Sequence, residues 1–302
     1  MNKLQGRVLA VHGKSSVLHH DGRIFRAALK KSLLKEKRQS SLLAAGDLVE
    51  FFLDPSGVAV IESVLPRSSS LSRPDILNKG KIQVIAANVD QLIIICSTAK
   101  PQFKPGLVDR YLVIAEKEKV KPVIVLNKID LRNPSEFAEY FEAWKRIGCD
   151  VYFTSAASGE GVDAVAKILR DKISVATGHS GVGKSTLINS IDPNLRLKTS
   201  EISRATGKGV HTTSAAVMYP LAGGGWIIDT PGLKVLDISI VRGKELQNYF
   251  PEFEGLRGRC QFGDCLHSSE PNCAIKQAVV DGDIAEFRYQ SYLRFMREIA
   301  GG

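Results

Sequence analysis

A glycine-rich stretch in the second half of the chain carries the residue types and spacing that bind phosphate. Residues 178–186 read GHSGVGKST, which matches the P-loop pattern Gly-x-x-x-x-Gly-Lys-Ser at every fixed position. Backbone N–H groups in such a loop, together with the start of the following helix, bind phosphate oxygens. We expect Lys184 to reach the β- and γ-phosphates of a nucleotide and Ser185 to ligate Mg²⁺. The expected phosphate-binding residues are Gly178, His179, Ser180, Gly181, Val182, Gly183, Lys184, Ser185 and Thr186.

Two further segments complete the phosphate side of this site. The sequence WIIDTPG places Asp229 at the end of an apolar strand, where P-loop hydrolases hold Mg²⁺ through water. Gly232 has no side chain, so its backbone N–H can approach a γ-phosphate. The polar segment 197–213 is typical of a switch, in which Thr212 or Thr213 offers a hydroxyl to Mg²⁺. The alternative for this segment is a surface loop without a ligand.

A short polar motif earlier in the chain has the hydrogen-bonding groups to select guanine. Residues 127–130 read NKID and follow an apolar strand. Asp130 can accept hydrogen bonds from guanine N1–H and from the exocyclic amine, which adenine does not offer together. The sequence TSA ends the next strand, where the Ala156 N–H can meet guanine O6. The residues expected to bind the base are Asn127, Lys128, Asp130, Ser155 and Ala156. Residues 127–130 are called the guanine loop below, and residues 178–183 the phosphate loop.

A third cluster has the composition of a zinc site. Cys260, Cys265, His267 and Cys273 supply three thiolates and one imidazole within fourteen residues, the soft ligands that tetrahedral Zn²⁺ prefers. Four protein ligands complete the coordination sphere, so we expect one structural ion. The alternative is three unrelated buried cysteines beside a surface histidine, which the spacing disfavours.

The elements that must position the nucleotide motifs alternate between strands and helices. Apolar strands such as QLIIICS, KPVIVLN and ISVAT are separated by amphipathic helical stretches. Near-continuous apolar strands of this kind are typical of a mostly parallel sheet covered by helices on both faces. Each motif directly follows one of these strands, so the sequence predicts that all of them lie at one edge of the sheet.

The order of these motifs is unusual. A GTPase normally runs from phosphate loop to switch, Asp-x-x-Gly, Asn-Lys-x-Asp and Ser-Ala, whereas here the last two come first. Joining the conventional termini near residues 171–173 restores the usual order. Folds tolerate such a rearrangement because chain termini often lie close together. The sequence therefore predicts a circularly permuted P-loop GTPase domain.

The flanking regions differ from this α/β pattern. Residues 1–66 contain short alternating strands with turn signals, which predict a β-barrel of the oligonucleotide-binding (OB) kind. A basic run, Lys30, Lys31, Lys35, Lys37 and Arg38, can follow an RNA backbone or form a solvated loop. RSSSLSRP at residues 67–74 is predicted to be a connector. We expect three domains: the barrel at 1–66, the permuted GTPase at 67–238 and a mainly helical zinc domain at 239–302, in which residues 243–256 are predicted to be helical.

The overall composition indicates in which cellular compartment the protein lies and which kinds of partner it can bind. The 302 residues carry a formal net charge of +9, which is compatible with a polyanionic partner. The sequence contains neither an apolar stretch near twenty residues nor a signal-peptide pattern. We expect a cytoplasmic protein without disulfides that does not bind membranes. We also expect a monomer.

Taken together, these motifs resemble the ribosome-small-subunit-dependent GTPase A family (RsgA, also called YjeQ). The resemblance covers nearly the whole chain. It rests on RSSSLSRP, NVDQ, NKID, GHSGVGKST, HTT at 211–213, Asp229 to Gly232, and the cysteine cluster with EPNCA. It implies a circularly permuted GTPase with an N-terminal barrel and a C-terminal zinc domain. It also implies GTP hydrolysis stimulated by the small ribosomal subunit, a role in late maturation of that subunit, and contacts with its rRNA.

The sequence departs from the pattern of this family in two places. His179 stands where the family usually has Gln, and we expect it to face solvent with limited effect. The switch of the family usually reads Gly-Arg-Gly-Arg-His-Thr-Thr, whereas residues 207–213 here read GKGVHTT, with Lys208 and Val210 in place of the two arginines. Val210 removes a guanidinium that could contact phosphate or rRNA.

Hydrolysis needs a group that orients the attacking water. Many GTPases place Gln directly after Asp-x-x-Gly, but Leu233 occupies that position here and offers no hydrogen bond. His211 is the best internal candidate, and it resembles the proposed catalytic histidine of the family. The alternative for His211 is a solvent-exposed histidine of the switch without a catalytic role. The predicted catalytic residues are His211, Lys184 and Thr212, with Ser185 and Thr212 on Mg²⁺. For the function as a whole, two alternatives to a small-subunit GTPase stay open. One is a permuted GTPase acting on the large subunit, and the other is a GTP-sensing RNA-binding adaptor with little turnover.

Overall fold

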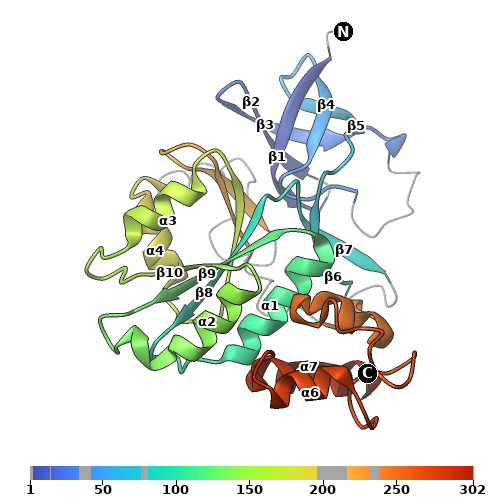
Figure 1. The fold of residues 1–302 in the computed structure, drawn as a ribbon. Coiled ribbons are helices and arrows are strands. Elements are labelled where there is room, and N and C mark those ends of the chain that lie inside the picture. The colour runs from blue at the N-terminus through green and yellow to red at the C-terminus, as the bar shows by residue number, and fades with distance from the viewer. Residues whose placement is uncertain are drawn as a thin grey trace.

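The N-terminal strands close into a small barrel (Figure 1). The computed structural model describes residues 3–13, 15–33, 42–75, 81–195, 216–230 and 238–301. The barrel strands are β1 (Leu4–His12), β2 (Ser15–His20), β3 (Arg23–Leu29), β4 (Leu48–Leu53) and β5 (Ala59–Val64). They pair in the order β1-β2-β3-β5-β4, and β4 returns to β1. Val8, Leu18, Val49, Phe51 and Ile61 fill the interior. This arrangement confirms the predicted barrel of the OB kind.

The central sheet is parallel except at one strand. Its strands are β8 (Gln91–Ser97), β9 (Lys121–Asn127), β10 (Asp150–Phe153), β11 (Ile173–Thr177), β12 (Val217–Pro220) and β13 (Trp226–Asp229). They lie in the order β10-β9-β8-β11-β13-β12, and β12 alone runs antiparallel. Because β9, β10, β11 and β13 are parallel, the motifs that follow them meet at one edge.

Helices cover both faces of this sheet, which explains its uninterrupted apolar strands. The helices are α1 (Pro105–Glu118), α2 (Ala138–Arg146), α3 (Val162–Leu169) and α4 (Lys184–Ile191). Within β8, Leu92 and Ile94 pack with α1 and α2, whereas Ile93 and Ile95 pack with α3 and α4. Alternate residues of each strand thus point into two different cores, so both must be apolar.

The barrel is connected to the central sheet by backbone pairing. Ala10 of β1 pairs with Val217 of β12, and Val217 pairs in turn with Asp229 of β13. β1 therefore belongs to both the barrel and the sheet. This continuous row brings the barrel to the strand that carries the predicted Mg²⁺ carboxylate.

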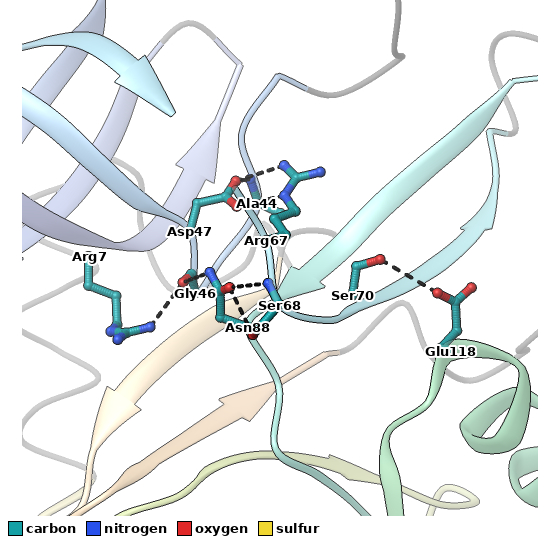
Figure 2. Close-up of polar contacts among 9 residues, drawn as sticks. All are labelled: Arg7, Ala44, Gly46, Asp47, Arg67, Ser68, Ser70, Asn88 and Glu118. Carbon is teal, nitrogen blue, oxygen red and sulfur yellow. Dashed lines mark hydrogen bonds and ion pairs between the residues drawn. The ribbon is translucent and has the colours of Figure 1, made fainter. Parts of the chain in front are cut away.

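A second connection holds the barrel against a hairpin that precedes the sheet (Figure 2). The guanidinium of Arg67 donates two hydrogen bonds to the Asp47 carboxylate, at 2.7 and 2.8 Å, and Asp47 is fully buried. The carbonyl of Gly46 accepts from the side chains of Asn88, at 3.0 Å, and Arg7, at 3.1 Å. A Cβ at Gly46 would lie 2.1 Å from the Ala87 carbonyl oxygen, so this close approach requires glycine.

One sequence expectation is wrong in this region. Residues 67–74 were expected to be a connector, but strand β6 (Ser70–Pro74) begins within them and pairs with β7 (Ile82–Ala87). Tertiary hydrogen bonds order this Ser-rich segment: Ser69 Oγ donates to Val89 O at 2.6 Å, and Ser68 N–H donates to Asn88 Oδ1 at 2.9 Å. The predicted domain boundaries stay predictions.

The C-terminal region is helical but contains less α-helix than expected. It comprises the 3-10 helices η4 (Ile238–Ile240), η5 (Gly243–Tyr249) and η6 (Pro251–Phe253) and the α-helices α6 (Ala274–Val280) and α7 (Glu286–Gly301). Residues 243–256 were predicted to be helical; most form 3-10 turns, which Pro251 interrupts. In the described parts of the chain, no helix is both long and apolar enough for a membrane span.

A buried charge cluster fastens α7 to the central sheet's helices. Arg288 of α7 donates to Asp109 of α1 at 2.7 Å and to Glu252 of η6 at 2.6 Å. The Trp144 indole of α2 donates to the same oxygen of Asp109 at 2.9 Å. Burial disfavours the charge of Arg288, but the two carboxylates outweigh it and raise the pKa of the guanidinium. Arg288 therefore stays charged between its partners.

Replacing Arg288 with Met should lower the free energy of unfolding by about 3–5 kcal/mol, because Asp109 would keep a buried charge without its partner. Arg297→Ala on the same helix is the matched control, since Arg297 is exposed and donates to Leu293 O of its own helix. It should change stability by no more than about 0.5 kcal/mol. Urea denaturation followed by circular dichroism compares the two. Equal losses of unfolding free energy in both variants would contradict the role of the buried charge cluster in fastening α7.

Candidate functional site

The phosphate loop joins β11 to α4, as its motif requires. Gly178 and Gly183 have φ values of +140° and +96°, and a Cβ on Gly178 would lie 2.0 Å from Ile95 O. Lys184 Nζ donates to the carbonyls of Gly178, at 2.9 Å, and His179, at 3.1 Å, so its ammonium lies over the loop. Glycines and a lysine in this geometry form a cradle that fits nucleotide phosphates.

The side chains at the rim of the phosphate loop are accessible. Ser185 and Thr186 at the start of α4 are exposed, as is His179. The exposure of His179 confirms the expectation that it faces solvent. Hydroxyl and carboxylate oxygens are ligands that Mg²⁺ accepts, so Ser185 and Asp229 fit the expected metal.

The guanine loop contacts the phosphate loop directly, although 55 residues separate the partners. Asn127, which is 1% exposed, donates from Nδ2 to Val182 O at 2.9 Å. Its Oδ1 accepts from Thr154 Oγ1 and from the Ala156 N–H, both at 3.1 Å. A Cβ on Gly183 would lie 2.4 Å from Asn127 Nδ2, so glycine is needed for this approach. The structure therefore brings the two predicted motifs together.

Other groups of the guanine loop are also held in place. Ser155 Oγ donates to Asp130 Oδ1 at 2.6 Å, which orients the exposed Asp130 carboxylate. Lys128 Nζ donates to the carbonyl of Gly181 at 2.6 Å and to that of Lys100. The Ala156 N–H was expected to face guanine O6; in this structure it bonds to Asn127 instead.

Asp229 lies at the same edge of the sheet, at the end of β13. Burial raises the pKa of its carboxyl, while the charge of Lys184 and the Thr230 N–H oppose the rise. The Asp229 side chain is nevertheless exposed, so its carboxylate is accessible to a Mg²⁺ ion at this edge. The other predicted residues on this side, His211, Thr212 and Gly232, lie outside the described residues, as do Val210 and Leu233.

The four predicted zinc ligands converge. The candidate donor atoms of Cys260, Cys265, His267 and Cys273 all lie within 4.8 Å of one another. Cys260 Sγ and Cys273 Sγ are 3.8 Å apart, and His267 Nδ1 is 3.4 Å from Cys273 Sγ. Two sulfurs bound to one tetrahedral Zn²⁺ at about 2.3 Å are separated by about 3.8 Å, so the cluster fits zinc.

The chemistry around the cluster also favours a metal. His267 Nε2 lies 2.8 Å from Gln247 Oε1, so Nε2 carries the proton and neutral Nδ1 faces the thiols. Burial lowers the pKa of His267, which favours this neutral form. Burial raises the pKa of Cys265 to about 12, so its thiolate needs a cation beside it.

Sequence reasoning missed two residues that support these sites. Gln247 lies in η5, thirteen residues before Cys260, and no spacing rule connects it to the cysteines. Thr98 directly follows β8 and its hydroxyl donates to Lys128 O at 2.5 Å. Its position after a buried strand, at the edge where the other motifs lie, was a signal that could have identified it.

The permuted strand order, the phosphate loop and the adjoining guanine loop define a circularly permuted P-loop GTPase. Residues 64–239 match the family model described as RsgA GTPase. The chain belongs to the RsgA GTPase family.

Individual relatives match over almost their full lengths. The small ribosomal subunit biogenesis GTPase RsgA of Chlorobaculum tepidum is 40% identical, over 98% of each chain, and that of Caldanaerobacter subterraneus is 39% identical, over 99% of this chain and 97% of the relative. The crystal structure of YjeQ from Thermotoga maritima matches with a TM-score of 0.81 and 32% identity over both complete chains. YloQ, described as a circularly permuted GTPase, matches with a TM-score of 0.76 and 27% identity, over 99% of this chain and 96% of YloQ.

The geometry of the cysteine–histidine cluster predicts a bound zinc ion. The purified protein should contain one zinc per chain, and Cys273→Ser should lose it and lower Tm, because three remaining ligands no longer close the site. Elemental analysis and thermal denaturation measure both effects. Cys149→Ala, which changes a buried cysteine outside the cluster, should keep the zinc. Retention of a full zinc ion by Cys273→Ser would contradict the assignment.

Proposed function

We propose that this protein hydrolyses GTP while bound to the small ribosomal subunit, in the late maturation of that subunit, and that the subunit stimulates its turnover. The observation that carries the proposal is the hydrogen bond from Asn127 to Val182 O, which joins base selection and phosphate binding at one edge of the sheet. Relatives at about 40% identity are named small ribosomal subunit biogenesis GTPases.

Each part of the site has a proposed task. The Asp130 carboxylate accepts from guanine N1–H and the exocyclic amine, while the phosphate loop and Lys184 bind the phosphates. Ser185 and Thr212 would ligate Mg²⁺, and Asp229 would reach it through water; a bound ion would supply positive charge next to the phosphates. The proposed nucleotide-binding set is the phosphate-binding and base-binding residues named from the sequence, with Asp229 and Gly232.

Hydrolysis requires water to attack the γ-phosphorus as the bond to the β–γ bridging oxygen breaks, releasing GDP and phosphate. His211 orients this water and accepts its proton. Leu233 cannot take over this task because its side chain has no polar atom. Turnover by the isolated protein is therefore slow, and docking on the subunit brings His211 into position.

The flanking regions supply the contacts with the subunit. On the barrel, Arg23, Arg26 and Lys31 lie exposed on β3 and the turn that follows it, where they suit an RNA backbone. The zinc ion stabilises the C-terminal region, which provides a second contact surface. The proposed domains are residues 1–66, 67–238 and 239–302, in a monomeric cytoplasmic protein.

Phosphate release with purified ribosomal subunits tests this proposal. Small subunits should raise the GTP hydrolysis rate well above that of the protein alone, and large subunits should not. Equal stimulation by large subunits would favour a factor for that particle. Absence of turnover under every condition, with GTP still bound, would favour a nucleotide-sensing adaptor.

His211→Ala in the same assay tests the proposed mechanism. The stimulated rate should fall about 100-fold or more, since a positioned general base contributes at least that much. Affinity for GTP should stay nearly unchanged, and Lys198→Ala, in the same segment, should keep the stimulated rate. Wild-type stimulated turnover in His211→Ala would remove this histidine from the mechanism.

A further inference from the structure

We propose that Thr98 is a positioning residue for the guanine loop and that its hydroxyl contributes to selectivity for guanine over related purines. This inference rests on the proposed function, because it concerns recognition of the nucleotide base. Thr98 contributes no atom to any of the motifs identified in the sequence.

Thr98 lies where the two halves of the permuted site meet. It directly follows β8, the strand between β9, which ends in the guanine loop, and β11, which leads into the phosphate loop. The preceding residue, Ser97, pairs with Asn127, and the Thr98 N–H donates to Asn127 O at 3.1 Å. Thr98 is only 1% exposed. Its side chain is therefore buried beside the guanine loop.

The Thr98 hydroxyl bonds to the carbonyl that closes the turn carrying Asp130. Lys128 O accepts from Thr98 Oγ1 at 2.5 Å and from the Leu131 N–H at 3.0 Å. The second bond spans residues 128–131, so Asp130 is the third residue of a hydrogen-bonded turn. Holding this carbonyl fixes the direction in which the turn presents the Asp130 carboxylate.

Lys128 needs such an anchor because its backbone is strained. Its φ is +64°, in the left-handed region that costs free energy for any residue with a Cβ. The same residue reaches the phosphate loop, where Nζ donates to Gly181 O at 2.6 Å. The Thr98 hydroxyl thus holds one backbone position on which both the base-binding carboxylate and the contact with the phosphate loop depend.

Loss of the hydroxyl should affect base recognition more than phosphate binding. Guanine gives Asp130 two hydrogen bonds, from N1–H and the exocyclic amine, and both need a correctly oriented carboxylate. Hypoxanthine lacks the amine and gives only one. A guanine loop with a less well-defined turn therefore loses more affinity for GDP than for inosine diphosphate.

Thr98→Val tests this inference in the full-length chain, because valine keeps the branched shape and removes only the hydroxyl. Titration calorimetry measures the dissociation constants for GDP and inosine diphosphate. The expected result is about tenfold weaker GDP binding, the loss of roughly one hydrogen bond, and a smaller GDP preference. Thr98→Ser, which keeps the hydroxyl, should restore most of that preference.

Ser97→Ala is the matched control. Ser97 is 2% exposed at the same strand end, but its hydroxyl donates to Pro101 O, at 3.1 Å, away from the guanine loop. It should retain the wild-type ratio of the two dissociation constants. If the valine variant fails to fold, Thr98→Ala replaces it as the test variant, because alanine also removes the hydroxyl and adds no volume.

The outcomes separate this inference from the function on which it rests. A wild-type ratio in Thr98→Val or Thr98→Ala, or an equal loss in Ser97→Ala, overturns the positioning role while the proposed function stands. A lower Tm with an unchanged ratio overturns it as well, because that result defines a purely structural residue. Wild-type protein that does not prefer GDP overturns the proposed function, and this inference with it.

Discussion

The nucleotide site depends on one buried carboxamide. Asn127 donates to Val182 O and accepts from Thr154 and Ala156, so a single side chain joins three loops that follow three different strands. Each such hydrogen bond contributes about 0.5–1.5 kcal/mol, and leaving a buried partner unsatisfied costs more. In this chain the guanine loop precedes the phosphate loop, the reverse of the conventional GTPase order. The Asn127 contact and the parallel strands beneath it bring these two loops together into one pocket.

The regions flanking the sheet are attached to it in different ways. The barrel shares a row of paired residues with the site, from Asp229 through Val217 to Ala10. The C-terminal region follows Asp229 in the chain but is held on α1, where Arg288 donates to Asp109, which also accepts from Trp144 of α2. Moving that region away from α1 would break this buried charge cluster, whereas the barrel is joined to the site by paired backbone.

Much of the molecule could be predicted from the sequence because its signals are local. The apolar strands, the phosphate loop and the cysteine spacing each specify their own structure, and the strand ends placed the motifs at one edge. Residues 70–74 were missed as a strand because their partners in β7 and their ordering hydrogen bonds are tertiary. The contacts of Gln247 and Arg288 were not predictable from spacing, since each depends on a distant segment. The place of Thr98 after a buried strand was a usable signal, but its hydrogen bond to Lys128 O is tertiary.

Under the proposed function, a guanine-selecting carboxylate and a phosphate cradle form one pocket despite their reversed order in the chain. The most direct test exchanges Asp130 for Asn and measures binding of GDP and xanthosine diphosphate, whose base carries a carbonyl in place of the amine. The wild type should prefer GDP, and the variant should prefer xanthosine diphosphate because an amide can donate to that carbonyl. Unchanged GDP affinity in Asp130→Asn, with no gain for the xanthine nucleotide, would contradict the account.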